Sequence, residues 1–261
     1  MRNKLYLILS LIFISGTILA SDIELDGVYQ GKNLYVMNPF ASSGIGFCVY
    51  EVRVNGQLTT DEINSSAFEI DLSVYQFKIG EKVKVVLKHK DDCMPKVLNP
   101  EVLESKSTYS IVSMNIDNGK LVWTTQKEAG SLPFIVEQFR WNKWVKIGTV
   151  KGKGTPGNNT YSVVVHPYAG NNKFRVKQID YTKKPHYSSE FTYKAKLPPV
   201  SFTPKKVTTE ITFNVPTMYE IYDYYGNIVK KGFGAKIDVS GLKSGEYFLN
   251  YDNKMDTFKK K

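Results

Sequence analysis

The chain has 261 residues, a formal net charge of +10, and 17 tyrosines alongside 14 phenylalanines. Its lysines are spread along the sequence instead of forming one basic stripe, which argues against a nucleic-acid-binding protein. Short β-branched and aromatic runs alternate with turn residues, and no long amphipathic helix pattern follows the N-terminal segment. The sequence predicts an all-β protein of three small β-sandwich, immunoglobulin-like domains in series after a signal peptide.

The N-terminal segment has the pattern of a secretory signal peptide. Arg2 and Lys4 precede an apolar run over residues 5–13, and small residues lead up to Ala20. This pattern predicts a signal peptide over residues 1–20 with cleavage after Ala20. A membrane anchor is the alternative, but the apolar run is short for a bilayer span and is interrupted by serines.

The first predicted domain covers residues 21–105. Residues 46–54 form the clearest strand pattern, and Asn55 with Gly56 marks a tight hairpin turn directly after it. Residues 81–89 alternate between apolar side chains and lysines, which is typical of a strand with one solvated face. The domain resembles an immunoglobulin-like or carboxypeptidase-regulatory-like sandwich.

The two cysteines, Cys48 and Cys93, both fall in this first domain. An even pair in an exported protein is interpreted first as a disulfide, and the loop it closes is long enough for about 4 kcal/mol of stabilisation. Two separate buried thiols are the alternative. Two cysteines with three scattered histidines do not favour a structural zinc site.

The second predicted domain covers residues 106–196. Its strand patterns lie at residues 119–125, 134–139, 144–150, 160–165 and 173–180. In that order they resemble a fibronectin type III-like module, which implies that Trp123 and Tyr161 are core aromatics. Trp141 and Trp144 carry two interpretations, because exposed tryptophans also serve as carbohydrate platforms, although packing in a core or at an edge is commoner.

Residues 197–206 are predicted to be a linker. Pro198, Pro199 and Pro204 favour extended polyproline geometry and exclude a central strand. The linker is expected to be a semi-rigid spacer that holds the last domain at a distance from the second.

The last predicted domain covers residues 207–261 and contains four short strands separated by turns. Its turn and strand positions agree with a recurring motif at Tyr222, Asp223, Gly226, Asp238, Ser240, Leu242, Gly245 and Tyr247, followed by the basic end Lys259–Lys261. This pattern resembles the type A C-terminal sorting domain of type IX secretion substrates in Bacteroidetes. One departure is that the Pro-Asn-Pro-like segment that usually leads into such domains is absent.

Motifs that could carry catalysis or a cofactor are scarce. Residues 152–157 read GxGxxG, but turn and strand residues follow where a phosphate loop needs a helix, so a long hairpin tip is predicted. His89, His166 and His186 have no metal-ligand spacing, and Asp91–Asp92 is interpreted as a turn. The sequence therefore predicts no catalytic residues, no cofactor-binding residues and no metal site.

Two functions in type IX secretion fit these features. The opening residues 25–56, followed by the two later modules, resemble the plug subunit of the type IX outer-membrane translocon. That resemblance implies a non-enzymatic periplasmic protein, associated with the outer membrane, that closes the translocon barrel when no substrate is passing. The plug is the favoured interpretation, with the barrel as its protein partner and no nucleic-acid or small-molecule partner. The alternative is a secreted or surface-attached cargo, such as an adhesin-like or matrix protein, and a small glycan hydrolase ranks third.

Overall fold

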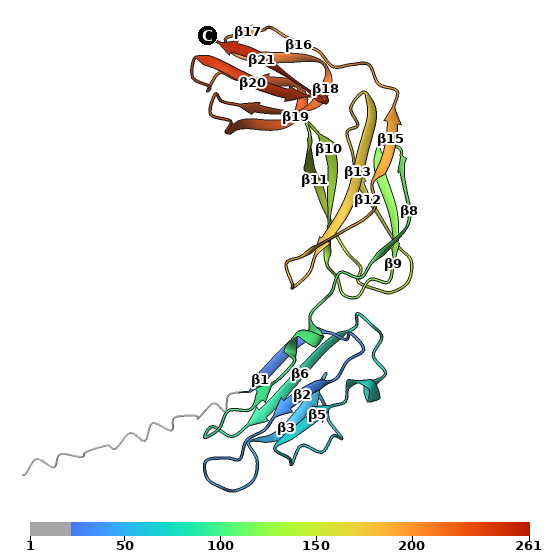
Figure 1. The fold of residues 1–261 in the computed structure, drawn as a ribbon, viewed down its shortest axis with the longest axis vertical. Coiled ribbons are helices and arrows are strands. Elements are labelled where there is room, and N and C mark those ends of the chain that lie inside the picture. The colour runs from blue at the N-terminus through green and yellow to red at the C-terminus, as the bar shows by residue number, and fades with distance from the viewer. Residues whose placement is uncertain (1–21) are drawn as a thin grey trace, which may run out of the picture. The chain divides into compact units, whose positions relative to one another are not determined.

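The computed structural model describes residues 22–261, so the predicted signal peptide lies outside the described residues. These residues form two compact units. The first comprises residues 22–26, 32–76 and 83–102, and the second comprises residues 27–31, 77–82 and 103–261. Strands dominate both units (Figure 1), and the described residues contain no α-helix, only the short 3-10 turns η1 (Leu72–Tyr75) and η2 (Pro100–Leu103). The all-β class is confirmed.

The first unit contains two small sheets, with strand orders β1–β6–β3–β4 and β5–β2–β7. The strands are β1 (Ile23–Val28), β2 (Leu34–Met37), β3 (Val49–Val54), β4 (Gln57–Leu58), β5 (Ala67–Ile70), β6 (Lys82–His89) and β7 (Lys96–Val97). The alternation predicted for β6 is present, because Val83, Val85 and Leu87 are buried while Lys82 and Lys84 are exposed. One face of this strand therefore forms core and the other is solvated.

Cys48 and Cys93 form a disulfide in the first unit, as the sequence predicted, with a Cα–Cα distance of 5.8 Å. Cys48 directly precedes β3, and Cys93 lies in the loop between β6 and β7. Asp92 lies in a turn, as expected, and its Oδ2 accepts a hydrogen bond from the Ser43 amide at 2.9 Å. The disulfide therefore joins the start of β3, in one sheet, to the loop that leads into β7 in the other sheet.

The second unit begins with a sandwich that corresponds to the predicted fibronectin type III-like module. One sheet has the order β12–β9–β8, and the other has the order β11–β10–β13–β14 with β15 also paired to β13. The strands are β8 (Ser110–Asp117), β9 (Lys120–Gln126), β10 (Pro133–Arg140), β11 (Lys143–Lys151), β12 (Asn159–Val164), β13 (Gly170–Ile179), β14 (Pro185–Tyr187) and β15 (Phe191–Ala195). We call this sandwich the middle domain.

Aromatic side chains fill the core of the middle domain. Trp123, Phe134 and Phe174 are completely buried, and the rings of Trp123 and Tyr161 stack with centroids 5.4 Å apart. Trp123 and Tyr161 lie directly opposite each other on β9 and β12, so the stack is a cross-strand pair. The prediction that both are core aromatics is confirmed.

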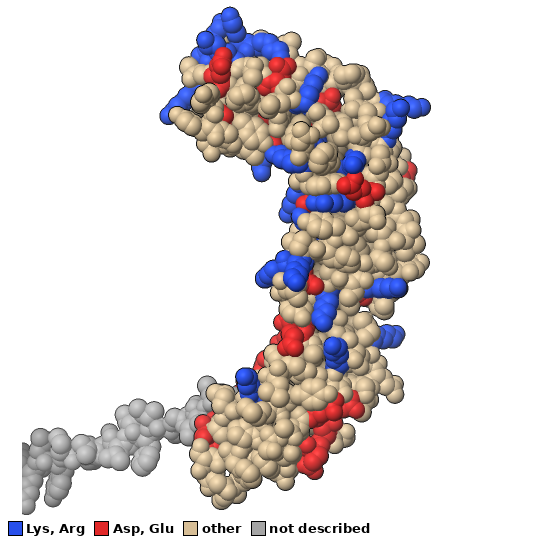
Figure 2. Space-filling view, viewed as in Figure 1, with Lys and Arg blue, Asp and Glu red and all other residues tan. Residues whose placement is uncertain are grey.

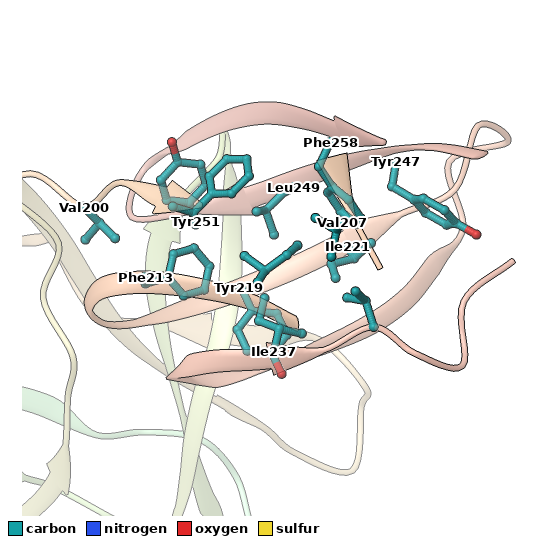
Figure 3. Packing of buried hydrophobic residues seen from close by; sticks show 13 residues of the cluster. Val200, Val207, Phe213, Tyr219, Ile221, Ile237, Tyr247, Leu249, Tyr251 and Phe258 are labelled. Carbon is teal, nitrogen blue, oxygen red and sulfur yellow. The ribbon is translucent and has the colours of Figure 1, made fainter. Parts of the chain in front are cut away.

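The C-terminal domain is one six-stranded sheet in the second unit, with order β16–β18–β20–β21–β17 and β19 paired to β18. The strands are β16 (Phe202–Thr203), β17 (Lys206–Val207), β18 (Glu210–Tyr222), β19 (Ile228–Asp238), β20 (Gly245–Tyr251) and β21 (Lys254–Lys260). Figure 3 shows side chains from several of these strands pointing toward one another in its core, among them Ile221, Ile237 and Leu249. The sheet therefore curls around a hydrophobic core of its own.

Strand β18 bends the sheet. Its register with β19 shifts between Thr212 and Thr217, and Pro216 lies in that interval. Proline cannot donate to a ladder, so within strands it is confined to edges and bulges. Beyond the irregularity, β18 changes its second neighbour from β16 to β20. Strand β18 thus pairs with β16 in its first half and with β20 in its second half.

The predicted linker at residues 197–206 is not a spacer. Val200 and Phe202 are each only 5% exposed and belong to the core of the C-terminal domain. Phe202 and Thr203 pair with β18, and Lys206 and Val207 pair with β21. The prolines permit this because they lie beside the short edge strands, and extended backbone geometry suits an edge. The domain therefore begins near residue 199 instead of 207.

Candidate functional site

Asp223 and Gly226 of the sorting-like motif form the tip of the β18–β19 hairpin. Asp223 Oδ1 accepts hydrogen bonds from the amides of Tyr225 at 2.9 Å and Asn227 at 2.8 Å, and its Oδ2 accepts one from Asn227 Nδ2 at 3.0 Å. These hydrogen bonds, led by the Asn227 side chain, lower the pKa of the Asp223 carboxyl. Gly226 has φ +82°, a conformation that favours glycine. Asp223 and Gly226 therefore fix the shape of this turn.

The second part of the motif forms the turn between β19 and β20. Asp238 Oδ1 accepts a hydrogen bond from the Ser240 amide at 2.9 Å, and the Ser240 side chain is the main cause of a lowered Asp238 pKa. Leu242 packs against the domain core, and Tyr247 stacks on Phe258 with centroids 5.5 Å apart. Because β19 separates the two turns, the structure divides the motif residues between opposite ends of this strand instead of bringing them together.

The basic end of the motif lies where β21 meets β17. Lys259 pairs with Lys206 on one side and with Glu246 on the other. Figure 2 shows basic side chains gathered over this end of the C-terminal domain. Lys261 is exposed, whereas Lys260 is only 7% exposed. Like charges directly opposite each other disfavour strand pairing, and Glu246 offsets part of that repulsion.

Tyr222, the first motif residue, contacts the middle domain. Lys143 Nζ donates hydrogen bonds to Glu220 Oε2 and to the Tyr222 hydroxyl, both at 2.7 Å. The Tyr222 hydroxyl in turn donates to Glu220 Oε2. Lys143 belongs to β11, so this small polar network joins the middle domain to β18 of the C-terminal domain.

A buried arginine forms the centre of this junction. Arg140, at the end of β10, is 1% exposed and donates from Nε to Gln138 Oε1 at 2.8 Å. Its Nη1 donates to the Asp252 carbonyl oxygen at 2.9 Å and its Nη2 donates to the His166 carbonyl oxygen. Burial lowers the pKa of the Arg140 guanidinium to about 10, and the Asp252 carboxylate opposes that shift. The guanidinium is therefore satisfied mainly by neutral oxygens from both domains.

Neighbouring contacts reinforce the junction. The Trp141 amide donates to Asn253 Oδ1 at 2.9 Å, and the rings of His166 and Phe233 stack with centroids 3.7 Å apart. The prediction that the C-terminal domain is held at a distance from the middle domain is therefore wrong. Sequence reasoning missed Arg140 because it lies 112 residues from Asp252, and no local pattern signals such a contact.

The two tryptophans considered as carbohydrate platforms both have structural contacts. Arg175 places its guanidinium 4.0 Å from the ring centroid of Trp144 and 4.1 Å from that of Tyr187. Its Nε also pairs with Glu137 at 2.7 Å. Trp141 lies in the β10–β11 turn with φ 50°, and its indole Nε1 is buried. These contacts favour the packing interpretation of both residues.

The GxGxxG segment connects β11 to β12, which belong to different sheets, so it is a crossover between sheets and not the predicted hairpin tip. The Gly154 amide donates to Glu128 Oε2 at 2.8 Å, and the Tyr161 hydroxyl donates to the same buried carboxylate. Strand β12 follows directly, where a phosphate loop requires a helix. The buried Glu128 carboxylate thus holds the loop in place by accepting a hydrogen bond from it.

The three histidines lie apart from one another. His186 Nδ1 lies 2.9 Å from the Ser107 carbonyl oxygen, and His89 Nδ1 lies 2.8 Å from that of Lys90. Within residues 22–261, no group of three or more His, Cys, Asp or Glu side chains is placed to share a metal ion. Over that same part of the chain, no helix has the length and apolar character needed to cross a bilayer.

Comparison with known families decides the nature of the C-terminal domain. Residues 203–261 match the family described as the secretion system C-terminal sorting domain. The predicted sorting domain is confirmed. A type IX sorting domain marks the chain as an exported protein. The match begins in β16, within the segment that was predicted to be a linker.

Among curated proteins, none matches this chain. Similar solved structures include a tetra-tandem repeat from the extending region of a large adhesion protein, at 10% identity and TM-score 0.32, covering 92% of this chain and 73% of that one. The FN1–FN3 domains of chicken CNTN1 match at 13% identity and TM-score 0.26, covering 89% and 90%. The Ig1–Ig3 ectodomain of mouse nectin-like molecule 4 matches at 12% identity and TM-score 0.21, covering 92% of each chain.

Proposed function

We propose that this protein is a non-enzymatic cargo of type IX secretion. The C-terminal domain directs the chain across the outer membrane, and the remaining β domains act at the cell surface or in the medium as an adhesin-like or matrix module. The match of residues 203–261 to the sorting-domain family carries this proposal. The sequence alone favours a periplasmic plug, with the cargo as its alternative. The family match supports the cargo and gives the plug no support.

The geometry of the C-terminal domain supports a working export signal. Its core is complete, with Ile211, Ile221 and Leu249 fully buried, and both motif turns have their hydrogen bonds. The absence of a Pro-Asn-Pro-like segment has therefore not degraded the fold. Residues Val200 and Phe202 cover the start of the core instead.

The buried carboxylates of the middle domain support a non-enzymatic role, because their hydrogen bonds and ion pairs are internal to the fold. Glu128 is buried and accepts hydrogen bonds from the Tyr161 hydroxyl and the Gly154 amide. Glu137 is buried between Arg175 and Lys177 on the outer face of the middle domain. Both carboxylates hold strands or loops in place, which is a structural role.

The test is secretion of the full chain and of a truncated chain that ends at Pro198, both produced in the native host. The full chain should reach the surface or the medium, and the truncated chain should accumulate in the periplasm. A second variant, Leu249→Asp, places a carboxylate in the sorting-domain core and should be retained in the same way. Both retained proteins should keep the Cys48–Cys93 disulfide, which shows that the first unit is folded. Equal export of the truncated chain would overturn the proposal.

A further inference from the structure

The two compact units carry net charges of opposite sign. Within residues 22–261, the first unit has 11 Asp and Glu against 6 Lys and Arg, which gives a net charge of −5. The second unit has 14 Asp and Glu against 27 Lys and Arg, which gives a net charge of +13. Figure 2 shows acidic side chains gathered over part of the first unit. Complementary charges steer molecules toward one another, and here both signs are present on the same chain.

The outer face of one sheet of the middle domain is basic. Along β13, Phe174 and Val176 are buried in the core, so the residues that alternate with them point to the other face of the sheet. The strand registers place six basic side chains on that outer face: Lys146, Lys151, Lys173, Arg175, Lys177 and Lys194. Within the five strands of this sheet, Glu137 is the only carboxylate, and it is buried between Arg175 and Lys177. We call this surface the basic face.

The charge of the basic face is only partly compensated by the chain itself. Lys146, Lys151 and Lys194 are exposed, and none of them forms an ion pair within residues 22–261. Tyr187 and Ile179, on the same side of the sheet, are 41% and 38% exposed. The basic face therefore combines free cations with apolar surface.

The first unit has an acidic counterpart on the outer face of its β5–β2–β7 sheet. Strand β2 alternates between buried and exposed residues, and its outward side chains Tyr35 and Met37 are 49% and 47% exposed. Glu69 of β5 lies directly opposite Tyr35, so its side chain shares that face. Lys96 is the only base on the three strands of this sheet.

Carboxylates gather beside β5 at the edge of that sheet. The Asp71 amide donates to Asp61 Oδ2 at 3.1 Å, which brings the segment before β5 next to the residue that follows it. The carboxylates held here are Asp61, Glu62, Glu69 and Asp71. In the described part of the chain none of these four forms an ion pair. We call this surface, together with Tyr35 and Met37, the acidic face.

We propose that the acidic face of one copy of this chain docks on the basic face of a second copy. Each face offers exposed apolar side chains next to unpaired charge, which is the usual composition of a protein interface with an apolar centre and a polar rim. The two faces are different surfaces, so the contact is head-to-tail and leaves one free face of each kind on every pair. Copies can therefore add in series.

A second copy is favoured over another polyanion because the complementary surface is on the chain itself. An acidic polymer would satisfy the lysines of the basic face but would leave Tyr187 and Ile179 exposed, and it would not account for the four unpaired carboxylates of the acidic face. The contact is a property of the folded chain, so this inference goes beyond the proposed export function and does not depend on it. It supplies a way for secreted copies to assemble.

The experiment measures the mass of the purified mature chain by sedimentation velocity. The average mass should rise over a roughly hundredfold range of protein concentration at about 50 mM salt, and it should fall to that of the monomer at about 500 mM salt, because salt screens exposed charges.

Two neutralising variants test the two faces separately. The variant of the basic face is Lys146→Gln/Lys173→Gln/Lys194→Gln, and the variant of the acidic face is Glu62→Gln/Glu69→Gln. Each should weaken self-association at least about tenfold, because each removes unpaired charge from one side of the contact. The matched control is Lys120→Gln/Lys127→Gln/Lys153→Gln, which removes the same charge from exposed positions of the middle domain outside the basic face and should associate nearly as the wild type does.

A mixture of the two neutralising variants is the decisive sample. The basic-face variant retains its acidic face and the acidic-face variant retains its basic face, so an equimolar mixture should form dimers but no longer chains. A mixture that stays monomeric overturns the inference, as does a wild-type chain that stays monomeric at low salt or a control variant that loses association as fully as the basic-face variant. Binding of alginate by a chain that remains monomeric, lost in the basic-face variant, would assign that face to an anionic polysaccharide and also overturn it. Melting temperatures equal to that of the wild type show that the variants are folded, and none of these outcomes bears on secretion, so the cargo function stands or falls separately.

Discussion

Two hairpin tips of the second unit carry aromatic side chains, and they have opposite surroundings. The β10–β11 tip holds Trp141 and Asn142, both in left-handed conformations, and packs against Asn253 of the C-terminal domain. The β18–β19 tip holds Tyr224 and Tyr225, which project into solvent. One aromatic turn is part of a joint between domains, whereas the rings of the other remain exposed in the described part of the chain.

The two tips show that the sequence of an aromatic turn does not by itself determine whether its rings are buried or exposed. Each turn has a local cause: the β10–β11 turn joins two long antiparallel strands, and the β18–β19 turn is held by Asp223. What decides whether such a turn is buried in a joint or left exposed is the neighbour that tertiary structure supplies. Arg140 supplies it for the first tip, because its guanidinium bonds carbonyl oxygens on both sides of the junction.

The largest expected effect comes from breaking the joint with Arg140→Ala. The change leaves the Asp252 and His166 carbonyl oxygens and Gln138 Oε1 without their donor and removes a buried side chain. We expect a loss of roughly 3 kcal/mol in the unfolding free energy of the second unit, or about 6–12 °C in its melting temperature. Calorimetry on the purified chain measures this.

The control for this variant is Arg53→Ala, whose side chain is 42% exposed in the first unit. It should shift stability by no more than about 0.5 kcal/mol. If Arg140→Ala and Arg53→Ala melt alike, the junction does not stabilise the second unit.

A smaller effect is expected from Asn253→Ala, which removes the acceptor of the Trp141 amide hydrogen bond at the same tip. The loss should be about 1 kcal/mol, the usual net value of one hydrogen bond. Chemical denaturation followed by the fluorescence of Trp123, Trp141 and Trp144, which all lie in the second unit, measures this loss. Unchanged stability together with an unchanged spectrum would show that the Trp141 tip is held by packing alone.

The His166–Phe233 stack makes the joint weakly sensitive to pH. Burial, followed by the charge of Arg140, lowers the His166 pKa below its unfolded value. The unfolded chain therefore binds the proton more readily. The free energy of unfolding consequently falls as the pH drops from about 6.5 toward the folded pKa, and His166 does not change it above about pH 6.5. Because the ring is partly exposed, the expected melting shift is below about 2 °C.

His166→Phe tests this sensitivity, since it keeps a ring on Phe233 and removes the titrating group. The difference in melting temperature between wild type and variant should change between pH 7.5 and pH 5.5. A constant difference over that range would contradict a lowered His166 pKa.

The smallest stability effect is expected at the exposed tip. Tyr224→Ser/Tyr225→Ser should change the unfolding free energy by no more than about 0.5 kcal/mol, because neither ring is buried. Thermal melting of the purified variant checks this. A large loss would mean that the tip contributes to folding, and the contrast between the two hairpins would disappear.

Local pattern predicted much of this molecule. Alternation located the strands, exported context with two cysteines predicted the Cys48–Cys93 bond, and turn residues identified the sorting domain. The linker prediction failed because prolines exclude only a central strand, whereas this segment pairs at the two edges of the sheet. Val200 and Phe202 also had apolar side chains to bury. The junction was missed because Arg140 and Asp252 are far apart in sequence.

Export of this protein by means of its C-terminal domain can be tested on the native protein itself. The most direct measurement is the intact mass of the native protein recovered from medium, cell surface and periplasm, in the wild-type host and in a host lacking the type IX outer-membrane barrel. If the protein is a type IX cargo, the wild-type host exports it without its sorting domain, as the resemblance to type IX substrates implies, and the barrel mutant retains it in the periplasm. A full-length, cell-associated chain that ends at Lys261 and co-purifies with the barrel would contradict export as a cargo and support the plug.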